Sequence, residues 1–292
     1  MTERNGVLPI DKPAGPTSHD VVARVRRALG TRRVGHTGTL DPFASGLLLI
    51  CIGGATRLSE YLTGLSKRYV ATMRLGEATD TDDLTGEPIF QSEAWRELTD
   101  EAIRAALAAQ VGERLQRPPR YSAKKVAGER MYASARRGEE VEGTPVSVTI
   151  HSIRVLAIAL PEIEFEVECG SGTYIRAIAR DVGEALGVGG HLTQLRRTRV
   201  GDFSVEDAVS LDALGDTAAV DRMMLSPAAA VRHLISVEVD EADVRALGYG
   251  KGIPAPLDVA TEVPIALLSG PDRLVAIGER VGSQILPRKV FA

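Results

Sequence analysis

The stretch GHTGTLDPFASG, residues 35–46, is the most unusual part of this 292-residue chain. Its three glycines permit tight turns and close approach of the backbone. Pro42 disfavours a helical conformation for Asp41, which places this carboxylate on a loop. A fixed carboxylate in a cleft can attack an electron-poor carbon or act as a general base. An Asp-Pro pair also starts many ordinary turns, so the spacing alone leaves both interpretations open.

The segments around this loop predict a mixture of strands and helices. Thr17 or Ser18 can cap a helix whose apolar residues recur with helical spacing up to Leu29, and Gly30 ends it. We therefore expect an α+β fold. The other predicted elements are strands at 6–10, 47–52, 67–75, 146–159 and 163–169, and helices at 56–62, 99–110, 173–186 and 226–234.

The composition changes near residue 235. From there to the end, short runs of Val, Ile and Leu are separated by many glycines and prolines, which is typical of a small unit of short strands. We therefore expect two domains, a larger domain at 1–235 and a β-rich module at 236–292.

Composition and hydropathy exclude several classes of protein. The chain is 44% hydrophobic and 25% charged, with a mean hydropathy of -0.02, which excludes disordered and fibrous proteins. Its longest apolar run, Leu47 to Ile52, is far shorter than the roughly 20 residues that cross a bilayer. We expect a cytoplasmic protein with no membrane contact. Cys51 and Cys169 are far apart and the five histidines are scattered, so we expect reduced thiols and neither a metal nor a cofactor.

The net charge of -4 conceals a strong segregation of charge along the sequence. Residues 21–40 hold five arginines and no acid, and residues 114–137 hold eight basic residues against one glutamate. Residues 77–101 and 206–243 hold nine acids each. Such a chain can present a basic face to a polyanion, although each basic run could also be an ordinary solvated surface. Pro118 and Pro119 interrupt regular structure in the second basic run, so we expect a protruding arm at about 114–142.

Five blocks of sequence, in this order, closely resemble the TruB family of tRNA pseudouridine-55 synthases. The resemblance covers about residues 6–235, and the end of the chain more loosely resembles a shortened PUA RNA-binding domain. The blocks are GHTGTLDPFASGLL at 35–48, KRYVATMRLGEATDTDD at 67–83, PPRYSAKKVAGERMYASARRG at 118–138, GTYIRAIARDVGEALG at 172–187 and HLTQLRR at 191–197.

This resemblance implies a reaction and a fold. The reaction is isomerisation of a uridine in the T-loop of tRNA, in which the C1′–N1 bond breaks, uracil turns in its pocket, and C5 bonds to C1′. The fold is a mixed, largely antiparallel central sheet flanked by helices, with the active cleft across its middle. The target base is stacked inside the T-loop, so the enzyme must flip it out.

The resemblance also implies three catalytic residues. Asp41 aligns with the essential aspartate of the family, and Arg176 with the arginine that pairs with this carboxylate. Tyr69 aligns with an active-site tyrosine that is placed to stack on the target base. A phenol with an ordinary pKa of about 10 is a weak base at neutral pH, so stacking is the better-supported role for Tyr69.

The resemblance extends to substrate binding. His36 aligns with a histidine that fills the space of the flipped bases, and Tyr174 and Leu195 align with residues of the uracil pocket. We expect phosphate contacts from the basic run at 21–40, the arm with Lys124 and Lys125, and the pair Arg196 and Arg197, while Asp83 orders a loop or bonds to a base.

Two other functions compete with this one. A guide-RNA-dependent pseudouridine synthase has a similar catalytic core, although the long arm favours an enzyme that works alone. A non-catalytic folding factor for tRNA could grip the T-loop with the same cleft. For the favoured function we expect a monomer that binds the T-arm of tRNA and needs no protein partner.

Overall fold

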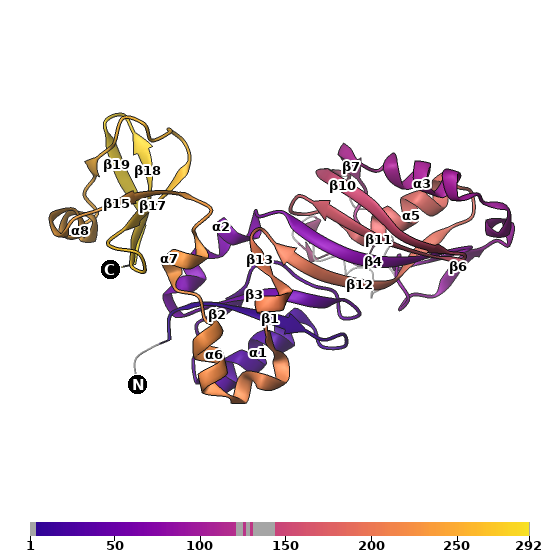
Figure 1. Cartoon of the computed structure of the whole chain (residues 1–292), viewed down its shortest axis with the longest axis horizontal. Helices are drawn as coiled ribbons and strands as arrows, with labels where there is room; N and C mark the ends of the chain where they lie inside the picture. The colour runs from indigo at the N-terminus through magenta and orange to yellow at the C-terminus, as the bar shows by residue number, and fades with distance from the viewer. Residues whose placement is uncertain (1–3, 121–124, 127–128, 131–143, 292) are drawn as a thin grey trace.

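A mixed sheet of ten strands forms the centre of the computed structural model, which describes residues 4–120, 125–126, 129–130 and 144–291. Most neighbouring strands are antiparallel, and β12 with β3 and β1 with β14 are the parallel pairs. This architecture confirms the predicted α+β fold (Figure 1). The strands are, in spatial order, β14 (Val209–Ser210), β1 (Gly6–Lys12), β3 (Ser45–Ile52), β12 (Gly190–Val200), β4 (Lys67–Leu75), β11 (Glu162–Cys169), β10 (Val146–Ala159) and β7 (Gly112–Gln116), with β2 (Val34–His36) beside β3 and β13 (Phe203–Ser204) beside β12.

Helices and short turns surround this sheet. The helices are α1 (Ser18–Leu29), α2 (Ser59–Thr63), α3 (Asp100–Ala108), α5 (Ile175–Ala185), α6 (Thr217–Met223) and α7 (Pro227–Ala230), and the 3-10 turns are η1 (Gly53–Leu58), η2 (Ala94–Glu97), η3 (Val205–Asp207) and η4 (Leu211–Gly215). Two small hairpins are formed by β5 (Glu77–Thr79) with β6 (Pro88–Gln91) and by β8 (Lys125–Val126) with β9 (Glu129–Arg130).

Helix α1 begins and ends where its capping residues require. The Thr17 side chain accepts a hydrogen bond from the Asp20 backbone, the Asp20 side chain bonds back to Thr17, and Gly30 closes the helix in the left-handed conformation with φ 63. The buried face of the helix, with Val21, Val22 and Val25, packs into the main core. The predicted helix at 226–234 is wrong in length, because α7 stops at Ala230.

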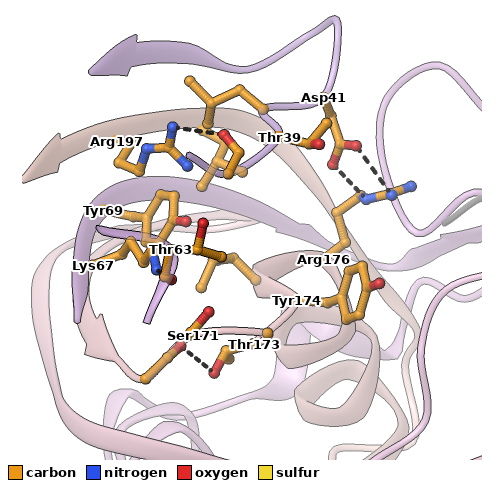
Figure 2. Close-up of a pocket in the computed structure, with 16 residues that line it drawn as sticks. Thr39, Asp41, Thr63, Lys67, Tyr69, Ser171, Thr173, Tyr174, Arg176 and Arg197 are labelled. Atoms are coloured by element: carbon orange, nitrogen blue, oxygen red, sulfur yellow. Dashed lines mark hydrogen bonds and ion pairs between the residues drawn. The ribbon is translucent and has the colours of Figure 1, made fainter. Parts of the chain in front are cut away.

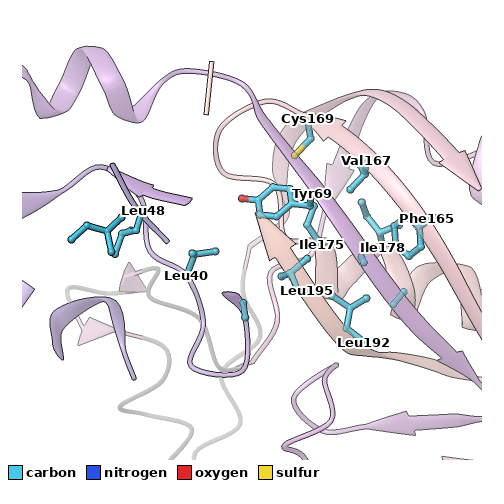
Figure 3. Packing of buried hydrophobic residues seen from close by; sticks show 14 of the residues in the cluster. Leu40, Leu48, Tyr69, Phe165, Val167, Cys169, Ile175, Ile178, Leu192 and Leu195 are labelled. Atoms are coloured by element: carbon cyan, nitrogen blue, oxygen red, sulfur yellow. The ribbon is translucent and has the colours of Figure 1, made fainter. Parts of the chain in front are cut away.

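One face of the sheet carries most of the core. Alternate residues of β4 and β11 are buried there, among them Ala71, Met73, Phe165 and Val167. Helix α5 packs on the same cluster through Ile178. In Figure 3 the ring of Tyr69 continues this apolar layer, and its hydroxyl points away from the Phe165 side toward Leu40.

A second sheet follows Leu234. Its strands run in the order β15 (Ile235–Glu238), β17 (Pro264–Leu268), β18 (Leu274–Val281), β19 (Gln284–Val290) and β16 (Ile253–Pro254), and helix α8 (Glu241–Gly248) lies beside them, in the yellow part of Figure 1. The sequence pattern indicated the strands but not α8, which has a capping box formed by Asp240 and Asp243.

The second sheet packs against the first part of the chain. Ala266 and Ile277 share a buried cluster with Leu58 and Leu62, which lie on η1 and α2. The Lys289 ammonium bonds to the Arg57 carbonyl oxygen and pairs with Glu60. The Arg57 guanidinium donates to the Val290 carbonyl oxygen at 2.6 Å. Apolar burial and polar bonds therefore both hold the two sheets together.

Candidate active site

A pocket of about 260 Å³ opens at the central strands β4 and β12, where they meet the loop after β2 (Figure 2). Four segments, separated in the sequence, build its wall. They supply Gly38, Thr39, Leu40 and Asp41, then Thr63, Lys67 and Tyr69, then residues 170–176, and finally Leu195 and Arg197. The pocket thus brings together all five predicted catalytic or uracil-pocket residues, which are Asp41, Tyr69, Tyr174, Arg176 and Leu195.

Asp41 and Arg176 form an ion pair at the pocket. Nε of Arg176 lies 3.0 Å from Oδ2 of Asp41, and Nη2 donates to Oδ1 at 3.4 Å. The Arg176 side chain is 4% exposed, whereas that of Asp41 is 34% exposed, so the carboxylate has an open side. Burial raises the pKa of Asp41, and the Arg176 guanidinium opposes this shift because it favours the ionised carboxylate.

Asp83 holds the other side of the Arg176 guanidinium. Nη1 of Arg176 lies 3.0 Å from Oδ2 of Asp83 and 2.8 Å from the carbonyl oxygen of Thr81. Oδ1 of Asp83 accepts bonds from the hydroxyl groups of Thr81 and Thr85 and from the Thr85 backbone N–H. Asp83 is buried outside the pocket wall, so its position fits the ordering of a loop rather than contact with a base.

Tyr69 and Leu195 form part of the opposite wall. Both side chains are 8% exposed and belong to the main hydrophobic cluster. Burial raises the pKa of the Tyr69 phenol, so the hydroxyl is protonated at neutral pH. An uncharged ring beside an apolar side chain is suited to stack on a flat base.

Arg197 lies inside the pocket wall, with 2% of its surface exposed. Its Nε donates to the Leu47 carbonyl oxygen at 2.7 Å and its Nη2 to the Gly38 carbonyl oxygen at 3.2 Å. These bonds and the burial of the side chain favour a structural role for Arg197, and its phosphate contact stays a prediction. The structure makes it a support of the loop that carries Asp41.

Two buried lysines near the pocket were missed from the sequence. Lys12 donates from Nζ to the carbonyl oxygens of Pro13 and Pro16 at 2.9 Å and of Pro42 at 3.4 Å. Lys67 donates to the carbonyl oxygens of Thr63 at 2.5 Å and Leu65 at 2.6 Å. Burial lowers the pKa of each lysine to about 8. Lys12 follows an aspartate and precedes a proline, and nothing in that local pattern indicates burial.

His36 ends β2, two residues before Gly38 of the pocket wall. Its Nδ1 accepts a hydrogen bond from the Gly38 backbone at 3.3 Å, and its ring meets His19 edge-on at a centroid distance of 5.5 Å. Burial lowers the pKa of His36 to about 4, so the ring is neutral at pH 7. A neutral flat ring is what the proposed stacking role requires.

Arg196, another predicted contact, is not part of the pocket wall. The half-exposed Arg196 forms a two-point ion pair with Asp11, with Nη2 to Oδ2 at 2.8 Å and Nη1 to Oδ1 at 3.0 Å. Lys124 lies outside the described residues. Lys125 belongs to the short strand β8, and its phosphate contact stays a prediction.

Two further features of the described residues concern membrane-spanning helices and metal-binding groups of side chains. None of the helices within those ranges is long and apolar enough to cross a membrane. Within the same ranges, histidine, cysteine and acidic side chains do not gather into a group of three that could hold a metal ion.

Family models match most of the chain. Residues 26–175 match the N-terminal domain of the TruB family of pseudouridylate synthases. Residues 176–238 match the C-terminal domain of tRNA pseudouridylate synthase B.

Curated relatives match over nearly the full length. The chain is 46% identical to tRNA pseudouridine synthase B of Arthrobacter sp. (strain FB24), over 99% of this chain and 97% of the relative. It is 44% identical to the protein of the same name from Thermobifida fusca (strain YX), over 99% of each.

Solved structures show the same fold. A chain in an H/ACA ribonucleoprotein bound to a substrate RNA containing 2′-deoxyuridine matches with a TM-score of 0.77 and 28% identity, over 98% of this chain and 85% of that chain. A chain of the archaeal box H/ACA Nop10–Cbf5 complex matches with a TM-score of 0.76 and 28% identity, over 99% of this chain and 86% of that one. Together with the family models and the curated relatives, this similarity shows that the chain belongs to the TruB family of pseudouridylate synthases.

Proposed function

We propose that this protein isomerises the T-loop uridine at position 55 of tRNA to pseudouridine and that it acts without a guide RNA. The observation that carries the proposal is the pairing of Asp41 with Arg176 at a pocket whose opposite wall is Tyr69 and Leu195. Membership of the TruB family and the names of the full-length relatives support tRNA as the substrate.

The chemistry requires one ionised carboxylate. The carboxylate of Asp41 can break the C1′–N1 bond either by adding to C1′ or by removing a ribose proton to give a glycal. Both routes start from ionised Asp41, and Arg176 favours that form while it fixes the orientation of the carboxylate. Uracil stays in the pocket, turns, and bonds to C1′ through C5. C5 then loses its proton and N1 takes up one, so the product is an isomer of the substrate. No water is consumed, so one carboxylate suffices where a hydrolase needs two.

The pocket wall supplies binding rather than proton transfer. The ring of Tyr69 offers a flat, uncharged surface for the flipped base, and Leu195 closes the space beside it. We assign His36 to the space that the base leaves in the T-loop, because its neutral ring lies just before the loop of Asp41. Flipping costs a few kcal/mol, which contacts of this kind offset.

The rest of the chain binds the body of the tRNA in this proposal. Exposed arginines of α1, among them Arg24 and Arg27, lie on a helix that carries no acid after Asp20. They and the arm at 114–142 contact phosphates of the T-arm, and the module at 236–292 adds a PUA-like RNA contact. The protein works as a monomer, since every residue assigned to the reaction comes from one chain.

The experiment is incubation of the purified protein with an unmodified tRNA transcript, without guide RNA, followed by position-resolved detection of pseudouridine. The expected product is a single pseudouridine in the T-loop, formed by the wild type and not by Asp41→Asn. Product formed only after addition of a guide RNA would favour a guide-dependent synthase. Tight binding of tRNA with no product under either condition would favour a non-catalytic folding factor.

A further inference from the structure

Gln116, the last residue of β7, uses its side-chain amide to hold the backbone of Tyr174. Its Nε2 donates to the Tyr174 carbonyl oxygen at 3.0 Å, and its Oε1 accepts from the Tyr174 backbone N–H at 2.8 Å. The side chain is 1% exposed, so water does not compete for either bond. A buried amide that satisfies both polar groups of one residue fixes that residue in two directions at once.

Through these two hydrogen bonds to Tyr174, Gln116 can affect the active site. Tyr174 is the N-cap of α5, with an extended backbone at φ -98 and ψ 111, and its own side chain makes no capping bond. It lines the pocket, and Arg176 follows two residues later in the first turn of the helix. The position of the Tyr174 backbone therefore sets where the turn that carries Arg176 begins.

A second bond joins α5 to the same part of the chain. Nη2 of Arg180, one helical turn after Arg176, donates to the Arg117 carbonyl oxygen at 3.0 Å. Gln116 itself is paired with Val146 across β7 and β10, so it is anchored in the central sheet. Residues 116 and 117, at the end of β7 and just after it, thus contact the start and the second turn of α5.

We infer that Gln116 is a positioning residue for the reaction, which acts through Tyr174 to place Arg176 against Asp41. The inference rests on the proposed function, because its effect is on the rate of uridine isomerisation. Gln116 does not line the pocket, so it places the machinery without touching the substrate. Misplacement of a catalytic pair by about 1 Å can cost a factor of about 10² in rate.

The first test is Gln116→Met, which keeps the length of the side chain and removes both hydrogen bonds. We expect the single-turnover rate at saturating enzyme to fall about 10- to 100-fold, while the Kd for tRNA changes by less than about twofold. The matched control is Gln110→Met. Gln110 is also buried, but its Oε1 makes no hydrogen bond within the described residues, so this variant should keep the wild-type rate.

The second test is Gln116→Glu. The rate of this variant should depend on pH if the hydrogen bonds of the side chain matter, and it should not if the side chain only fills space. An ionised carboxylate there still accepts a hydrogen bond from the Tyr174 N–H but is repelled by the Tyr174 carbonyl oxygen. The protonated acid can instead donate a hydrogen bond to that carbonyl oxygen. Burial raises the pKa of such a carboxyl. The rate of this variant relative to the wild type should therefore rise as the pH is lowered from about 8 to about 5.5, and the same ratio for Gln116→Met should stay flat.

The outcomes separate the inference from the proposed function. A wild type that makes no pseudouridine overturns the proposed function and this inference with it. An active wild type with an unaffected Gln116→Met rate overturns the inference alone, and so does parallel loss of tRNA binding and rate, which would make Gln116 a binding contact. If Gln116→Met does not fold, the pH response of Gln116→Glu decides, and a flat ratio for that variant overturns the inference.

Discussion

Nε of Arg176 lies 3.0 Å from Oδ2 of Asp41, although 135 positions separate the two residues in the chain. The guanidinium is buried and held on its far side by Asp83, while the carboxylate keeps an open side toward the pocket. The arginine is therefore the fixed partner, and Asp41 is the partner that can meet a substrate.

Replacement Asp41→Asn should abolish isomerisation and leave tRNA binding intact. The amide cannot add to C1′ or take a proton, so the single-turnover rate should fall by at least about 10³-fold. Burial raises the pKa of Asp41 in the folded protein above its value in the unfolded chain. The resulting contribution to stability is complete below the unfolded pKa and is lost as the pH rises through the folded pKa. The variant should accordingly melt no lower than the wild type at pH 7, as thermal unfolding would show. A drop in tRNA affinity that matches the loss of rate would argue against a catalytic role.

Replacement Arg176→Lys should be severe in spite of the conserved charge. Arg176 reaches Asp41 through Nε and Nη2 and Asp83 through Nη1, and one ammonium group cannot occupy these positions together. We expect the single-turnover rate to fall about 10²- to 10³-fold. The control is Arg154→Lys, at an exposed pair with Glu166, which should leave the rate unchanged. Near-normal turnover of Arg176→Lys would show that simultaneous bonding to Asp41 and Asp83 is dispensable.

The half-buried His36 should make the protein sensitive to acid. Its folded pKa of about 4 lies below the usual value of 6.5, so its contribution to stability is complete above about pH 6.5 and is lost as the pH falls toward about 4. The ring is partly exposed, which reduces the effect. When the pH is lowered from 7 to 4.5, the Tm of His36→Phe should fall by about 2–4 °C less than that of the wild type. This difference corresponds to about 1 kcal/mol in the free energy of unfolding. Equal losses in both proteins would contradict this assignment.

Gly46 should not accept even a methyl group. It has φ +104, and a Cβ there would lie 2.2 Å from the carbonyl oxygen of Arg197, its partner across β3 and β12. We expect Gly46→Ala to lower the free energy of unfolding by about 2–3 kcal/mol, measured by denaturant titration. The same change at Gly35, which has no atom within 4 Å of its Cβ position, is the control and should cost far less. Similar stabilities for the two variants would refute the close contact.

The local elements of the fold could be predicted where the chain signals its own boundaries. The Thr17 cap and Gly30 define α1, and continuous apolar or alternating patterns give β4 and β10 with their observed ends. Strand β12 has no such pattern, because it mixes glycine, threonine, glutamine and arginine. It nevertheless lies in the middle of the sheet. Its Arg197 is buried, whereas arginine side chains are usually exposed.

The site could be predicted only through its resemblance to a family. Spacing makes Asp41 a possible turn residue and Arg176 a possible surface residue, and nothing local shows that the two meet. The structure brings them together because β3 and β12 pair in parallel and α5 precedes β12. Lys12, Lys67 and Gln116 were missed for the same reason, since their roles depend on carbonyl and N–H groups brought close by the fold.

The place of β12 has a consequence for the order of events during synthesis. This strand lies between β3 and β4, although it is made long after both. A nascent chain that ends before Gly190 therefore has two separate half-sheets, one with Asp41 and the other with Tyr69 and Arg176. The pocket closes only when β12 joins them, so a truncated product of translation would bear every catalytic side chain and still have no active site.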